Sequence, residues 1–134
     1  MKTTHRWILS LAILILVSSG CTAALIGGAA VGAGTGTFVY LKGELKTDYN
    51  QSFDSVWKAC EKPVADMRGL DVMPAKEIGK GKIAAVIDGE KVDISVTYKA
   101  KNLTTVSIRV GLIGNKQSSQ LIHDKIEENL SKAQ

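Results

Sequence analysis

Residues 82–99 read KIAAVIDGEKVDISVTYK, and this stretch decides the fold. Apolar and polar residues alternate in its second half, which is typical of a strand with one buried face and one face in water. The apolar residues there are Val92, Ile94, Val96 and Tyr98. Asp88-Gly89 supplies the two residues of a tight hairpin turn. The stretch therefore predicts an antiparallel pair of strands over residues 82–87 and 91–99.

Segments on both sides of this hairpin predict further strands and two helices. Strands are expected at residues 38–47, 70–73 and 104–112. Apolar residues recur at spacings of three and four from Phe53 to Met67 and again within residues 116–132, which predicts two amphipathic helices. The resulting order is β-α-β-β-β-β-α. It predicts an α+β two-layer sandwich, with two helices on one face of an antiparallel sheet of four to five strands.

Prolines and glycines set the expected ends of several elements. Pro63 falls inside the first helix and is expected to kink or shorten it, because proline lacks the N–H and clashes with the preceding turn. Strand 70–73 is expected to end before Pro74, and residues 79–82 (GKGK) are interpreted as a flexible basic turn. One side of strand 38–47 is expected to carry Val39, Leu41 and Leu45. The inward residues of the last helix are expected to be Leu121, Ile122, Ile126 and Leu130.

The lead that precedes this domain is charged only at its start. Lys2 and Arg6 are followed by residues 7–41, which contain no Asp, Glu, Lys or Arg. Residues 7–17 are an apolar core of the length found in secretory signals, and this core is short for a membrane span of about 20 residues. The lead therefore predicts export, with residues 1–20 as a signal peptide.

The lead ends in small residues before a cysteine. Ser19, Gly20 and Cys21 resemble the lipobox of bacterial lipoproteins, although Ser18 stands where lipoboxes carry a branched apolar residue. The resemblance implies cleavage before Cys21 and a diacylglycerol with an acyl chain such as palmitate on that cysteine. An uncleaved signal anchor and ordinary secretion with Cys21 as a plain thiol are the alternatives. Apart from this covalent lipid, no cofactor is expected.

A Gly/Ala-rich segment follows the cysteine. We interpret residues 21–37 as a lipidated cysteine with a tether, and residues 38–134 as a periplasmic α+β domain. Gly28, Gly32 and Gly36 follow one another at four-residue intervals. On a helix they would form one close-packing face. The alternative is therefore a glycine-zipper membrane component that self-associates.

The domain and the lead together resemble a family of small bacterial lipoproteins of unknown function. Besides the lipobox cysteine and the Gly/Ala stretch, the resemblance rests on VYLKGEL at 39–45, SIRVGLIGN at 107–115 and IHDKI at 122–126. It implies a place in the cell envelope, on the cell membrane or the outer membrane, and no assigned activity. Thr22 after the cysteine, in place of Asp, resembles lipoproteins sorted to the outer membrane.

Charge and motif content exclude several classes of function. Subtracting Lys2 and Arg6 from 17 basic residues leaves 15 against 13 acidic ones, a formal charge of +2. The chain has no basic run with interleaved aromatic residues, so nucleic-acid binding is not expected. It also lacks motifs for metal binding or catalysis, so we expect a binding or scaffolding module rather than an enzyme. Expected partners are the membrane and an envelope protein, and the oligomeric state is not indicated.

A few side chains of the domain suggest specific contacts. Arg109 is a candidate anchor for an anion or an acidic partner, and a pocket near Trp57 and Tyr98 would suit a small-ligand carrier. Lysines that could face anionic headgroups are Lys76, Lys80, Lys82 and Lys91. Packing or surface positions are expected for Cys60 and His123, a turn position for Asp88 and a solvent-facing strand position for Asp93.

Overall fold

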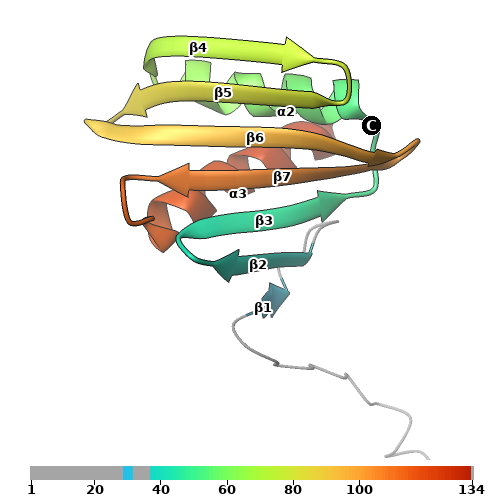
Figure 1. Ribbon diagram of the computed structural model, residues 1–134, viewed down its shortest axis with the longest axis horizontal. Helices are drawn as coiled ribbons and strands as arrows, with labels where there is room; N and C mark the ends of the chain where they lie inside the picture. Colours follow the sequence, from blue (N-terminus) through green and yellow to red (C-terminus); the bar gives the residue numbers. More distant parts are fainter. Residues whose placement is uncertain (1–28, 32–36, 134) are drawn as a thin grey trace, which may run out of the picture.

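A seven-stranded antiparallel sheet with two helices forms the part of the chain that the computed structural model describes, residues 29–31 and 37–133 (Figure 1). The strands are β1 Ala29–Val31, β2 Thr37–Leu41, β3 Glu44–Tyr49, β4 Leu70–Glu77, β5 Lys80–Ile87, β6 Glu90–Ala100 and β7 Leu103–Val110. The helices are α2 Phe53–Asp66 and α3 Lys116–Lys132. Across the sheet the strands lie in the order β1-β2-β3-β7-β6-β5-β4.

Both helices lie on one side of the sheet, behind it in Figure 1, so the molecule has two layers. Helix α2 contacts β5, β6 and β7, α3 contacts β7 and β3, and the two helices contact each other. The predicted α+β class, with an antiparallel sheet and two helices, is therefore confirmed. The predicted strand number and order are wrong, because three strands rather than one precede α2.

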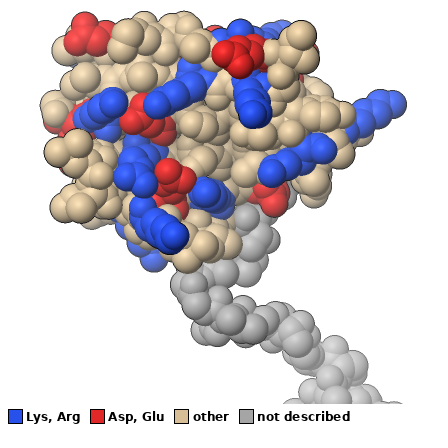
Figure 2. Space-filling model, viewed as in Figure 1, with Lys and Arg blue, Asp and Glu red and all other residues tan. Residues whose placement is uncertain are grey.

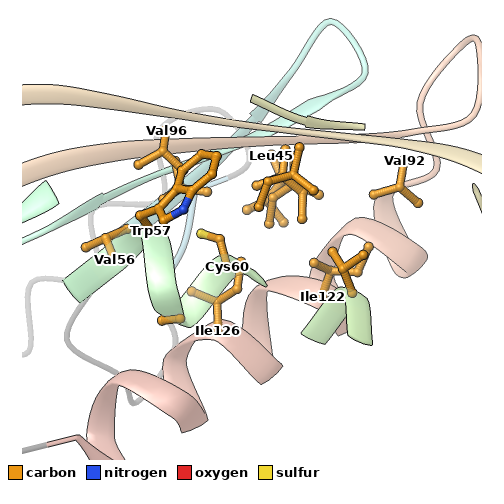
Figure 3. Close-up of a cluster of buried hydrophobic side chains, with 14 of the residues drawn as sticks. Leu45, Val56, Trp57, Cys60, Val92, Val96, Ile122 and Ile126 are labelled. Carbon is orange, nitrogen blue, oxygen red and sulfur yellow. The ribbon is translucent and has the colours of Figure 1, made fainter. Parts of the chain in front are cut away.

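The core lies between the two layers. Trp57 and Cys60 from α2 and Ile122 and Ile126 from α3 point toward sheet residues such as Val96 (Figure 3). Burying each large apolar side chain contributes about 1.5–3 kcal/mol relative to leaving it in water. The alternation predicted for strand 91–99 is present, with Val92, Ile94 and Val96 buried and the residues between them only partly so. The Asp88-Gly89 turn also lies where it was predicted, between β5 and β6.

Short-range hydrogen bonds mark both ends of helix α2. The Ser52 side chain caps it by accepting a hydrogen bond from the Ser55 N–H at 3.4 Å. Pro63 neither stops the helix nor shortens it to that point, since α2 continues to Asp66. Because Pro63 lies in the last turn, few backbone bonds depend on it. The chain leaves the helix where the Gly69 N–H donates to the Val64 carbonyl at 2.8 Å.

The segment predicted as one strand at 38–47 is a hairpin. Lys42 and Gly43 have φ values of 52° and 82°, and these two left-handed residues reverse the chain between β2 and β3. The reversal changes which side chains share a face. Leu45 is fully buried under the helices, whereas Val39 pairs with the exposed Lys46 on the other face. The prediction that Val39, Leu41 and Leu45 share a side is therefore wrong.

Two further strand boundaries differ from the prediction. Strand β4 continues through Pro74 to Glu77. It lies at the edge of the sheet, so no strand on its outer side requires the N–H that proline lacks. The β4–β5 turn lies at Ile78 and Gly79, so residues 80–82 belong to β5 rather than to a flexible basic turn.

Helix α3 spans the predicted residues and is capped by Asn115, whose side chain accepts from the Ser118 N–H at 3.2 Å. Ile122, Ile126 and Leu130 are buried as predicted, but Leu121 is half exposed. No helix among the described residues combines the length and the apolar character needed to cross a bilayer.

Candidate functional site

The residues predicted to carry the lipid anchor lie outside the described part of the chain. This holds for Ser19, Gly20 and Cys21 and equally for Gly28, Gly32 and Gly36. The lipidation and helix-packing assignments therefore stay predictions. Residues 29–31 are described, and they form strand β1 paired with β2 rather than part of a helix.

The surface best placed to contact a partner is the sheet face that no helix covers, which we call the open face. It faces the viewer in Figure 2, where basic and acidic side chains are interspersed. Its polar residues are Glu44, Lys46, Asp48, Lys80, Lys82, Lys91, Asp93, Ser95, Thr97, Thr105, Ser107 and Arg109. Ser95 pairs with Ser107 and Thr97 with Thr105 across β6 and β7, so the centre of the face is a group of hydroxyls.

Arg109 does lie on the open face, but its guanidinium is engaged within the chain. It donates to the Lys42 carbonyl at 3.0 Å and to the Leu112 carbonyl at 3.3 Å, and it forms an ion pair with Glu44 at 3.3 Å. These contacts join the β2–β3 turn to the loop after β7. The predicted role of Arg109 as an anchor for an external anion is therefore weakened, because its hydrogen-bonding groups hold two loops together instead.

Carboxylates on the open face are paired with neighbouring groups. A hydrogen bond from Ser107 at 3.0 Å, opposed by partial burial, is the main cause that lowers the pKa of Glu44 below its ordinary value, with Lys46 and Arg109 adding to it. Asp93 lies 3.0 Å from Lys82 and 3.6 Å from Lys91. Asp93 lies on β6 with its side chain on the open face and Asp88 lies in the β5–β6 turn, as predicted for both residues.

A shallow hollow of about 470 Å³ lies on the open face over β4, β5 and β6. Its lining is Ala75, Glu77, Lys80, Gly81, Lys82, Ser95, Val96 and Thr97. The lining therefore includes two lysines and two residues with hydroxyl groups, beside the single acidic residue Glu77. Such a donor set suits a carboxylate or another anionic group of a partner.

The lysines predicted to face anionic headgroups do not share one side of the sheet, because Lys80, Lys82 and Lys91 lie on the open face and Lys76 lies on the opposite side. Lys76 is hydrogen-bonded to Asp54 at 2.8 Å and lies over the rings of Phe53 and Trp57. Lys82 and Lys91 share Asp93, as described above. The structure therefore provides no single basic surface made of these residues.

Trp57 fills the space in which a small-ligand pocket was predicted. It is 4% exposed, stacks with Phe53 at 6.3 Å and donates through Nε1 to Glu61 at 2.8 Å. A Cβ added to Gly81 would come within 2.1 Å of its ring. Tyr98, the other aromatic residue of that prediction, is half exposed on β6.

A buried polar cluster between α3 and β3 is the feature that sequence reasoning missed. His123 is 1% exposed and lies between the rings of Phe38 and Tyr49, at 5.0 and 6.1 Å. Its Nε2 is 3.5 Å from Glu127 Oε1, which is long for a hydrogen bond. Within the described chain no hydrogen-bond partner reaches Thr47 Oγ1, the Tyr49 hydroxyl, Ser119 Oγ, His123 Nε2 or Glu127 Oε1, whereas His123 Nδ1 is 3.2 Å from Asp124 Oδ1. Because the imidazole is enclosed, it cannot meet a substrate from solution.

Titration of this region follows from burial. Desolvation raises the pKa of the Tyr49 hydroxyl, with Cys60 and Glu127 adding to the shift. Burial likewise raises the pKa of the Cys60 thiol, which is fully enclosed and therefore inert as a nucleophile. Over residues 29–31 and 37–133, no group of three or more His, Cys, Asp or Glu side chains is placed to hold a metal ion.

Comparison with protein families identifies the chain. Residues 5–129 match a family described as proteins of unknown function, DUF3568. The chain belongs to this family. The DUF3568 match begins within the charged start of the lead and ends inside α3, so it covers the lead and the domain together. A comparison with curated proteins found no match.

Proposed function

We propose that this DUF3568 protein is a lipid-anchored protein of the cell envelope whose domain is a non-catalytic binding or scaffolding module. The observation that carries the proposal is the lead, in which Lys2 and Arg6 precede an apolar core and Ser19-Gly20-Cys21 follow it. The family match supports treating the lead and the domain as one unit, because it spans both. In this proposal the domain faces the periplasm, and Thr22 favours sorting to the outer membrane in a cell with two membranes.

The open face is the surface through which we infer that the module binds. Support comes from its geometry: helices cover the other face only, and the hollow over β4–β6 gathers Lys80, Lys82, Ser95 and Thr97. Lys82 also has Asp93 at 3.0 Å, so the lysine is held in place near the hollow. The donors favour an envelope protein that presents carboxylates to this face.

The anchor is tested by intact mass. The protein extracted from native membranes is compared with Cys21→Ala and with a matched control, Cys60→Ala, which removes the other cysteine. We expect a mass for residues 21–134 plus acyl chains in the unaltered protein and in the control. We expect neither lipid nor this cleavage in Cys21→Ala. A full-length, unmodified mass in the unaltered protein would contradict the proposal.

The binding face is tested by charge reversal. Lys80→Glu with Lys82→Glu reverses the hollow, and Lys99→Glu with Lys101→Glu makes the same charge change at exposed positions outside its lining. Cross-linking in intact cells followed by purification compares the captured proteins. The proposal expects a partner that the first pair loses and the second pair keeps. Equal capture by both pairs would exclude the hollow as the contact.

A further inference from the structure

Two loops at one end of the sheet expose three large apolar side chains. Leu112 and Ile113 in the loop between β7 and α3 are 91% and 93% exposed, and Leu41 at the end of β2 is 56% exposed. We call Leu41, Leu112 and Ile113 the apolar tip. Both loops lie at the left end of the sheet in Figure 1. Single exposed apolar side chains are ordinary, but apolar side chains gathered at one place mark contacts with a membrane or a partner.

The tip is held rigidly although its side chains are free. A Cβ on Gly114 would lie 2.3 Å from the Gly43 Cα, so the two loops touch through backbone atoms. Arg109 bonds the carbonyls of Lys42 and Leu112, which joins one loop to the other. The Asn115 N–H donates to the Val110 carbonyl at 2.8 Å and closes the second loop. The backbone thus fixes these apolar side chains on the outside.

Charges around the tip suit a lipid–water boundary. Lys42 and Lys116 are exposed, each close in sequence to a tip residue, and neither forms an ion pair with the described residues. Glu44, Glu90 and Asp88 also lie at this end. Glu44 is bonded to Ser107 and Arg109 and Glu90 to Ser118, whereas Asp88 is exposed in the β5–β6 turn, three strands away from Leu41 across the sheet. Lysine stems can lie along apolar chains while their ammonium groups remain in water. Two free lysines beside three aliphatic side chains match that arrangement.

The position of the anchor favours this end of the domain, because Leu41 lies on the strand next to β1 whereas the opposite turn lies far across the sheet. Cys21 is eight residues before Ala29, so it lies at most about 28 Å from Ala29 along the chain. Ala29 pairs with Val39, two residues before Leu41 on the neighbouring strand, so the tip is close to this point. The opposite end also exposes an apolar residue, Ile78, but that turn starts β5, five strand spacings or about 24 Å across the sheet from β1.

We propose that the apolar tip inserts into the surface of the bilayer that carries the lipid anchor. This inference rests on the proposed anchoring at Cys21 and adds the part of the domain that contacts lipid. Leu41, Leu112 and Ile113 enter the boundary between headgroups and acyl chains, and Lys42 and Lys116 remain at the headgroups. The tip then fixes the direction in which the domain stands on the membrane.

The test measures lipid contact at each end of the domain in the full-length protein. Ile113→Cys and Ile78→Cys are purified from membranes, reacted with an environment-sensitive fluorophore and reconstituted into vesicles of phosphatidylethanolamine and phosphatidylglycerol. The native cysteines do not interfere, because Cys60 is buried and Cys21 is lipidated in the proposal. We expect lipids that carry a nitroxide to quench the probe at position 113 severalfold more than the probe at position 78.

Each outcome bears on the proposal. Serine at positions 41 and 112, in the Ile113→Cys protein, is expected to reduce the quenching, and circular dichroism checks that the fold is retained. Equal or absent quenching at both positions in protein that floats with vesicles would overturn the tip and leave the anchor standing. Blue-shifted emission at position 113 without lipid would assign the tip to a protein contact instead. Protein that does not float would overturn the anchor and the tip together.

Discussion

Replacement of Gly81 by alanine is the sharpest test of how α2 packs on the sheet. A Cβ at this position would lie 2.1 Å from Trp57 Cζ3 and 2.6 Å from Cε3. Ordinary contacts between such atoms are about 3.5–4.0 Å, so the indole or the strand must move by more than 1 Å. The indole has little freedom, because it stacks with Phe53 and donates a hydrogen bond to Glu61.

The expected size of the effect combines two opposing terms. Overpacking a filled core costs about 1–3 kcal/mol, and the loss of glycine's flexibility in the unfolded chain returns about 0.4–1 kcal/mol. We expect Gly81→Ala to lower the free energy of unfolding by about 1–2 kcal/mol. In a domain of this size that corresponds to a fall in Tm of roughly 5–15 °C. Urea and thermal unfolding are followed by circular dichroism, because this signal does not depend on Trp57.

A double-mutant cycle separates the clash from other effects. Trp57→Leu removes the ring atoms that the new methyl group would meet, so Gly81→Ala should be much less destabilising in that background. We expect a favourable coupling energy of about 1 kcal/mol or more between the two substitutions. If Gly81→Ala were neutral or stabilising in the unaltered background, the close approach of α2 to β5 would be refuted.

Three further predictions concern single side chains. Arg109→Met removes the bonds that join two loops and should lower the free energy of unfolding by about 1–2 kcal/mol, with faster amide exchange in both loops measured by mass spectrometry. The lowered pKa of Glu44, caused first by Ser107, means that its contribution is complete above the ordinary pKa of 4.5 and is lost as the pH falls through the lowered value. Glu44→Gln should therefore be less stable than the unaltered protein at pH 7, with the difference fading in urea titrations as the pH is taken below 4.5. Cys60 should react with a maleimide at pH 8 only after unfolding, because burial raises the pKa of its thiol. Rapid labelling of the native protein would contradict its enclosed position.

The parts of the fold that could be predicted are those in which local chemistry and tertiary packing agree. Asp88-Gly89 supplies the left-handed residues of a hairpin turn, with φ values of 50° and 79°, and its flanking strands alternate as a half-buried sheet requires. The helices could be located for the same reason, since Ser52 and the apolar spacing both indicate α2.

The wrong strand boundaries lie where a residue adopts a conformation or position that is uncommon for its type. Lysine rarely adopts a left-handed conformation, so Lys42-Gly43 gave a weaker turn signal than Asp88-Gly89, although both make the same reversal. Pro74 reads as the end of a strand unless its edge position is known, and that position depends on the order of all seven strands. Spacing along the chain does not contain this information.

The candidate sites divide in the same way. The lipidation of Cys21 stays a prediction, and it rests on sequence alone because an export signal acts as a linear motif. The buried stripe of Ser119, His123 and Glu127 keeps a four-residue spacing beside the apolar stripe of α3, and that spacing was the available signal. An open polar face could be predicted from the alternating strands and the two amphipathic helices, but the hollow on it could not, because its lining depends on β4 and β5 lying beside β6 in the strand order.

The proposed lipid anchor, the apolar tip and the open face together imply that one end of the domain contacts lipid and the other end contacts a partner. Strands run from the tip toward the β4–β5 turn, so a tip seated in the bilayer would stand the sheet upright and leave the open face accessible from the side. The hollow that contains Lys80 lies toward the end away from the tip. It also lies far from β1, on the side of the sheet where β4 forms the edge. The lipid-binding end and the proposed partner-binding surface would then be separated by most of the sheet, so a partner could bind without displacing the membrane contact.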